Sequence, residues 1–279
     1  MHDQGLFKAY VEVDGLKLAY LVGGEGEPVV FVHGWPTHSY LWRHQMPALA
    51  GSFCVYALDL PGCGDSEKPS DVRYSLDFFS DILNGFLNAM GVEQVTLVSH
   101  DLGGPISLLW AVRHPERLAR LVIMDTMPYP DLPMMIRLML PAARLPVVGR
   151  ALVSRRGLRL AFRMGTVGKG VVTDAMVAAY DQPYVGDPAA RKTLLRILAE
   201  LDPREMVEIA QNLERITAPT LILWAEKDPS APLSIARRLE ADMQCATLKT
   251  IPNCGHFLTE DQPDEVTRLL LEFLEGVRL

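Results

Sequence analysis

Residues 95–104 read Val95-Thr96-Leu97-Val98-Ser99-His100-Asp101-Leu102-Gly103-Gly104, an apolar run that stops abruptly before a helical pattern over 105–114. We interpret this as a buried strand, a sharp turn and a helix, with Asp101 at the apex of the turn. A residue at such an apex has a strained backbone and an exposed side chain, and the turn needs small neighbours such as Ser99 and Gly103. A carboxylate nucleophile attacks carbon and leaves an ester, so the favoured target is a saturated carbon with a leaving group. The alternative is an Asp that only caps the next helix.

Composition sets limits on the class of protein. The chain has 279 residues, 49% hydrophobic and 22% charged, which suits one large α/β domain or a core domain with an insertion. Its net charge of -7 argues against nucleic-acid binding and disfavours an anionic membrane surface. Neither a secretory signal nor an apolar run of ~20 residues is visible, so we expect a cytoplasmic protein that does not bind a membrane. The cysteines lack metal-ligand spacing and are expected as free thiols: Cys54, Cys63, Cys245 and Cys254.

Apolar runs alternate with amphipathic segments along most of the chain, which predicts a doubly wound, mostly parallel sheet. Asp14-Gly15 separates two alternating segments and indicates an N-terminal hairpin. The predicted strands span 10–13, 16–22, 29–32, 54–60, 95–100, 118–124, 220–225 and 246–251. The predicted core helices span 41–50, 76–90, 105–114, 233–241 and 263–276.

The alternation of predicted strands and helices stops at about Met127. A Met- and Leu-rich region with several prolines follows, and it lacks strand patterns up to Thr220. We predict a helical cap over 127–212, inserted into a core domain of 1–126 and 213–279. Its methionines would either pack the cap or line an apolar substrate cavity, where flexible thioether side chains adapt to shape: Met134, Met135, Met139 and Met164.

Four titratable residues follow predicted strands: Asp101, Asp125, Asp228 and His256. Catalytic groups collect at the carboxyl ends of parallel strands, and the chain order nucleophile, acid, histidine resembles that of the α/β-hydrolases. The resemblance implies the α/β-hydrolase fold over about residues 11–274 and an Asp-nucleophile branch. Three further segments support the resemblance. One resembles a usual loop of the superfamily, residues 61–66 (PGCGDS). Two are similar to the oxyanion loop and the catalytic-His loop of haloalkane dehalogenases, namely residues 33–43 (HGWPTHSYLWR) and 255–265 (GHFLTEDQPDE).

This resemblance implies a role for each residue. Asp101 would displace a leaving group from saturated carbon to give an alkyl ester, and water deprotonated by His256 would hydrolyse that ester. Asp228 would hold the imidazole, with Asp125 as the alternative acid, since some haloalkane dehalogenases carry it there. The backbone N–H groups of Trp35 and Leu102 would bind the oxyanion. No cofactor or metal is implied, the substrate and water are the expected partners, and the protein would be a monomer or homodimer. His33 and His100 are expected to be structural.

Leu102 stands where haloalkane dehalogenases carry a Trp whose indole N–H holds the departing halide. Trp35 would then be the remaining indole donor, or else an apolar wall. Leu102 also replaces the Arg expected in fluoroacetate-type dehalogenases, which favours a neutral, hydrophobic substrate.

Other activities of the same scaffold stay open. An epoxide hydrolase would need tyrosine donors in the cap, for which the sequence offers Tyr129, Tyr180 and Tyr184. Met134 and Met164 are further candidates for the substrate pocket. The scaffold also resembles cofactor-free oxygenases of the luciferase kind, and it can serve as a ligand-binding module.

Overall fold

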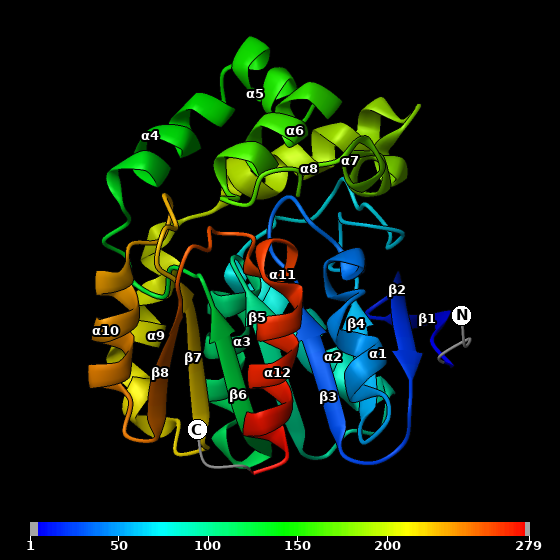
Figure 1. Ribbon diagram of the computed structural model, residues 1–279. Helices are drawn as coiled ribbons and strands as arrows, with labels where there is room; N and C mark the ends of the chain where they lie inside the picture. Colours follow the sequence, from blue (N-terminus) through cyan, green and yellow to red (C-terminus); the bar gives the residue numbers. More distant parts are fainter. Residues whose placement is uncertain (1–4, 277–279) are drawn as a thin grey trace.

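A computed structural model describes residues 5–276 and shows one eight-stranded sheet (Figure 1). The strand order is β1-β2-β4-β3-β5-β6-β7-β8; β3 to β8 run parallel, and the β1–β2 hairpin joins β4 in antiparallel orientation. The predicted mostly parallel sheet of the α/β-hydrolase fold is therefore confirmed. Residues 1–4 and 277–279 of the predicted core lie outside the described part. The strands are β1 (Phe7–Val13), β2 (Leu16–Gly23), β3 (Pro28–Val32), β4 (Cys54–Leu58), β5 (Val95–His100), β6 (Leu118–Met124), β7 (Thr220–Ala225) and β8 (Ala246–Ile251).

Helices cover both faces of this sheet, which explains why its central strands are continuous apolar runs. Every residue of β5 and of β7 is buried. On one face α1 (Gln45–Leu49) contacts α12 (Pro263–Leu274), which follows the short α11 (Leu258–Asp261). On the other face α2 (Leu76–Ala89) contacts α3 (Gly103–Arg113), which contacts α9 (Val207–Asn212), while α10 (Leu233–Asp242) packs beside β7 and β8 (Figure 1).

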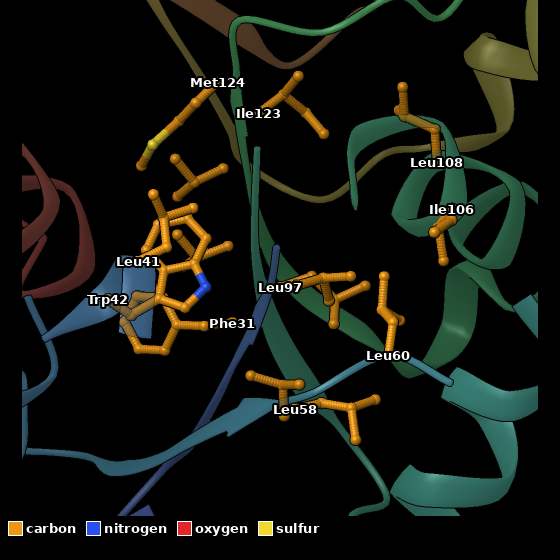
Figure 2. Close-up of a cluster of buried hydrophobic side chains, with 14 of the residues drawn as sticks. Phe31, Leu41, Trp42, Leu58, Leu60, Leu97, Ile106, Leu108, Ile123 and Met124 are labelled. Atoms are coloured by element: carbon orange, nitrogen blue, oxygen red, sulfur yellow. The ribbon is translucent and has the colours of Figure 1, made fainter. Parts of the chain in front are cut away.

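Large side chains fill the space between sheet and helices. Figure 2 shows Phe31 of β3 against Trp42 on one side of the strands, and Leu97 and Ile106 on the other. The ring centroids of Phe31 and Trp42 are 5.0 Å apart, and all four side chains are fully buried. Burial of each such side chain contributes about 1.5–3 kcal/mol, so this core holds the strand ends in fixed positions.

Five helices between β6 and β7 lie over the carboxyl ends of the strands (Figure 1). We call them the cap helices: α4 (Met134–Ala143), α5 (Pro146–Leu152), α6 (Arg155–Met164), α7 (Asp174–Asp181) and α8 (Pro188–Glu200). The predicted division at residues 127 and 212 stays a prediction; α9, near its second boundary, packs on α3 of the core. None of the helices within residues 5–276 combines the length and apolar character needed to cross a bilayer.

Candidate active site

Asp101 occupies the turn between β5 and α3 with a φ of 51°, in the left-handed region that non-glycine residues seldom adopt. Several bonds hold this turn: the Asp101 N–H donates to the Met124 carbonyl (3.2 Å), and the Thr126 hydroxyl donates to the Asp101 carbonyl (2.6 Å). A Cβ on Gly103 would lie 2.1 Å from the Val32 carbonyl oxygen, so this position excludes a side chain. A strained backbone conformation at a strand end points to a functional residue. Asp101 has this conformation at the apex that the sequence predicts.

Backbone donors converge on the Asp101 carboxylate. The Trp35 N–H donates to its Oδ1 at 2.7 Å. Burial opposes ionisation of this carboxyl, but hydrogen bonding and charge from His256 and a hydrogen bond from the Leu102 N–H keep its pKa below the ordinary value. Asp101 is therefore an anion whose Oδ1 accepts from the Trp35 N–H, a donor placed to stabilise a developing oxyanion.

The His256 imidazole lies between two carboxylates. Its Nε2 is 3.4 Å from Asp101 Oδ2, and its Nδ1 is 2.7 Å from Asp228 Oδ2. The other oxygen of Asp228 accepts from the Ser230 N–H (2.6 Å), the Ser230 hydroxyl (2.7 Å) and the Ala231 N–H (3.0 Å). Burial lowers the pKa of the imidazole, but the Asp228 charge and both carboxylate contacts raise it well above 6.5. The resting imidazole therefore holds its proton at neutral pH.

Asp125, the alternative acid, is buried one strand away and makes a different set of contacts. Its Oδ1 accepts from the Ala225 N–H at 2.9 Å, and its Oδ2 has no partner among the described residues. Burial and the charge of Asp228 raise the pKa of the Asp125 carboxyl well above its ordinary value, which favours its neutral form. Within residues 5–276 the structure brings Asp228, and not Asp125, to the imidazole.

A cavity of about 750 Å³ opens above Asp101 and His256. The cap helices supply most of its lining, with Met135, Leu138 and Met139 from α4 and Leu160 and Met164 from α6. The lining is mostly apolar, which suits a neutral, hydrophobic ligand. Three of the four candidate methionines thus line the cavity. The expectation for Met134 was wrong: its side chain is largely exposed outside the cavity, because the buried face of α4 is formed by Ile136 and Leu140.

The three candidate cap tyrosines do not line this cavity. The Tyr129 hydroxyl donates to Asp242 Oδ2 (2.8 Å), and the buried Tyr180 hydroxyl donates to Glu260 Oε1 (2.6 Å). The Tyr184 hydroxyl accepts from the Gly64 N–H (3.3 Å). Tyr180 and Tyr184 lie at the end of α7, where they pack down onto the core instead of facing Asp101, so their placement as pocket residues was wrong.

Trp35 lines the cavity with its ring, but its indole donor is already engaged. The indole N–H donates to the Leu194 carbonyl of α8 at 2.8 Å, and the Leu102 side chain has no donor. The Trp35 side chain is therefore an apolar wall of the cavity and not the free indole donor that was the other interpretation. The backbone N–H of Trp35 donates to the Asp101 carboxylate.

Sequence reasoning missed a buried ion pair that fixes the geometry of the site. The Arg43 guanidinium donates two bonds of 2.6 Å to the Glu260 carboxylate, which also accepts from Tyr180. This cluster joins the segment before α1, the short helix α11 that follows His256, and the cap helix α7. Both residues stand in the two segments that resemble dehalogenase loops, which was the available signal.

The two histidines expected to be structural make backbone contacts. His100 Nε2 is 2.8 Å from the His256 carbonyl oxygen, and His33 Nε2 accepts from the Leu60 N–H at 3.0 Å. Burial lowers the pKa of each imidazole to about 4, so both are neutral.

The titration of His256 tests which carboxylate sets its charge. Replacement of Asp228 by Asn should lower the imidazole pKa because the nearest anion is lost, and an NMR titration of the ring protons measures it. The matched variant Asp125→Asn should leave the pKa almost unchanged, since Asp125 bonds to Ala225 and it is Asp228 that contacts the imidazole. A shift in Asp125→Asn without one in Asp228→Asn would contradict this assignment.

Comparison with known proteins agrees with this fold. The family model for the alpha/beta hydrolase fold matches residues 27–263. A haloalkane dehalogenase of Sphingobium indicum is 32% identical, over 97% of this chain and 96% of the relative. A cis-3-alkyl-4-alkyloxetan-2-one decarboxylase of Shewanella oneidensis is 33% identical, over 95% of this chain and 87% of the relative. The crystal structure of haloalkane dehalogenase DatA from Agrobacterium tumefaciens C58 superposes with a TM-score of 0.86 and 26% identity, covering all of both chains. The chain is therefore a member of the α/β-hydrolase family, with haloalkane dehalogenases among its homologues.

Proposed function

We propose that this protein hydrolyses a neutral, hydrophobic substrate at saturated carbon through an alkyl ester of Asp101, as a haloalkane dehalogenase-like enzyme. The observation that carries the proposal is the Asp101 carboxylate itself. Its Oδ1 is held by the Trp35 N–H, while its Oδ2 is near His256 and the carboxylate lines the apolar cavity.

The two oxygens of Asp101 have different tasks in this reaction. Oδ2 forms a bond to the substrate carbon as the bond to the leaving group breaks, and the leaving group departs as an anion with the electron pair. Oδ1 becomes the ester carbonyl oxygen, which the Trp35 and Leu102 N–H groups then polarise. Each such donor lowers the barrier by about 3 kcal/mol, judged from oxyanion donors removed in other enzymes.

Alkylation of Asp101 prepares His256 to act as the base. The ester carries no charge, so the imidazole loses one of the two anions that raise its pKa. The Nε2 proton is then released together with the departing anion. The neutral Nε2 then deprotonates a water that attacks the ester carbonyl carbon. Collapse of the tetrahedral intermediate expels the alcohol oxygen, which takes the proton from His256 and leaves Asp101 as a carboxylic acid. Asp101 then passes its remaining proton to His256 Nε2, which restores the resting carboxylate and imidazolium. Asp228 holds the Nδ1 proton throughout.

A trapped ester tests this mechanism. In His256→Ala the ester should form but persist, because no base activates water, and intact mass would show the added alkyl group after incubation with a bromoalkane. Asp101→Asn/His256→Ala is the matched control and should show no added mass. Absence of an adduct in His256→Ala, or an adduct that survives loss of the Asp101 carboxylate, would contradict the proposal.

The departing anion meets no free indole donor, since Leu102 has none and the Trp35 N–H binds Leu194. A halide must lose hydration in this apolar cavity, which is costly without replacement donors. We therefore expect faster turnover of bromoalkanes than of chloroalkanes, measured as halide release, because the weaker carbon–bromine bond needs less assistance.

Trp35→Phe should leave this preference for bromide unchanged and Leu102→Trp should reduce it, because only the second variant alters the donors facing the cavity. A loss of dehalogenation in Trp35→Phe alone, with the fold intact, would show that the indole binds halide. An epoxide substrate would need a proton donor other than the three engaged tyrosines, and diol formation in the same assay detects it.

A 3,4-dialkyl oxetan-2-one is a second candidate substrate, because the leaving group of this ring is a carboxylate that stays attached to the substrate. Attack of Asp101 Oδ2 on the saturated ring carbon C4 breaks the ring C–O bond and frees the carboxylate. Loss of CO₂ then forms an alkene and expels the Asp101 carboxylate, so water and a base are not consumed. The relative from Shewanella oneidensis carries the name of this activity.

Product analysis separates the two candidates. For a lactone, alkene formation should continue in His256→Ala and disappear in Asp101→Asn, as measured by gas chromatography. A hydroxy acid as the product, with no alkene, would contradict decarboxylation of the oxetan-2-one. It would leave hydrolysis through the Asp101 ester as the function.

A further inference from the structure

The cap helices carry a charge opposite to that of the whole chain. Residues 132–173 contain eight basic residues and no acidic one, although the net charge of the protein is -7. The remainder of the chain therefore holds the entire acidic excess. These basic residues are Arg137, Arg144, Arg150, Arg155, Arg156, Arg159, Arg163 and Lys169.

Most of these charges are exposed and unpaired. Arg137, Arg150, Arg155 and Arg163 are exposed and have no carboxylate within 4 Å among the described residues. Arg159 differs, since it pairs with Asp174 of α7. The arginines thus present a positive surface that internal acids do not neutralise.

Large apolar side chains are exposed on the same helices. Met134 of α4 is 76% exposed and Val147 of α5 is 82% exposed. Leu138 of α4 and Leu160 of α6 are 66% and 59% exposed, and both also line the cavity above Asp101. The exposed apolar surface and the cavity above Asp101 therefore share Leu138 and Leu160. We call the surface formed by these apolar residues and the unpaired arginines of α4 to α6 the cap face; its residues are Met134, Leu138, Val147, Leu160, Arg137, Arg150, Arg155 and Arg163.

We propose that the cap face docks on an anionic lipid surface and takes its apolar substrate from the bilayer. Figure 1 places α4 to α6 at the end of the molecule away from the sheet, where a flat surface can reach them. Arginines attract anionic headgroups, and exposed Met, Leu and Val side chains enter the boundary between headgroups and acyl chains. The acidic core points away from the lipid, so the separated charges also orient the protein.

Continuity with the cavity favours a lipid surface over an acidic protein or a second copy of this chain. A neutral, apolar substrate partitions into a bilayer, and a cavity mouth pressed against the bilayer receives it without passage through water. Docking depends on the cap face and not on the chemistry at Asp101, so it can hold or fail independently of the proposed function.

Vesicle sedimentation tests the docking. The protein should bind vesicles of phosphatidylcholine mixed with phosphatidylglycerol, bind phosphatidylcholine vesicles far more weakly, and dissociate at salt on the order of 1 M. Arg150→Gln/Arg155→Gln should weaken binding at least about tenfold, since each basic residue near an anionic surface contributes. Met134→Ser/Val147→Ser should also weaken binding, because both side chains are exposed and outside the cavity lining.

The matched control removes two charges from the core. Arg215→Gln/Arg237→Gln should bind as the unaltered protein does, because both residues are exposed on the core domain, Arg215 just before β7 and Arg237 on α10. All variants should keep the far-ultraviolet circular dichroism spectrum and the thermal unfolding midpoint of the unaltered protein, which shows that they fold whether or not the protein releases bromide.

Three results would overturn the proposal: no binding to anionic vesicles, equal binding to both kinds of vesicle, or equal loss of binding in the two arginine pairs. A salt-sensitive dimer in light scattering, lost in Arg150→Gln/Arg155→Gln and accompanied by no vesicle binding, would assign the cap face to a second copy instead.

Discussion

The left-handed backbone of Asp101 is the constraint on which the site depends. It turns the chain sharply enough to aim a carboxylate out of the strand, and it requires neighbouring backbone to approach without side chains. A Cβ on Gly34 would lie 2.3 Å from Asp101 Oδ1, and a Cβ on Gly103 would lie 2.1 Å from the Val32 carbonyl oxygen. That closeness lets the Trp35 N–H reach the carboxylate at 2.7 Å. The strained turn persists because Met124 and Thr126 of the adjacent strand and loop hold it on the other side.

Electrostatics connects this turn to the proposed reaction. One imidazole contacts two carboxylates, while burial and the charge of Asp228 raise the pKa of a third carboxyl close by, that of Asp125. Asp228 keeps its anion because three donors from Ser230 and Ala231 hold one of its oxygens. In the proposed cycle the charge of Asp101 disappears on alkylation, so the basicity required of His256 differs between the two half-reactions. A single histidine can thus hold a proton in the first step and accept one in the second.

Sequence periodicity was sufficient to predict the sheet and the helices that cover it, because buried parallel strands leave mostly apolar runs such as 95–98 and 220–225. It also placed Asp101 and His256 at one edge, since parallel strands end together. It could not choose between Asp228 and Asp125, because both follow strands at that edge and only folded loop donors separate them. The cap was less predictable: the rotation of each helix decides whether Met134 or Tyr180 faces the cavity, and that rotation depends on tertiary contacts. The partner of the Trp35 indole, the Leu194 carbonyl of α8, likewise depends on how the cap packs on the core. Net charge was similarly uninformative about the cap, since it averages over opposite ends of the molecule.

The insertion of the cap between β6 and β7 also determines the order in which a growing chain can assemble. Strand β6 pairs with β5 on one side, but its other edge, which includes Val122 and Ile123, waits for β7. Residues 125–219 must be synthesised first, which takes on the order of 5–20 s at typical ribosomal rates. During that interval a long apolar edge is exposed, and such edges favour pairing between chains. The proposed nucleophile, Asp101, is therefore made early and His256 late, so a ribosome-bound chain carries the strained turn before the two residues, Asp228 and His256, that would complete the site.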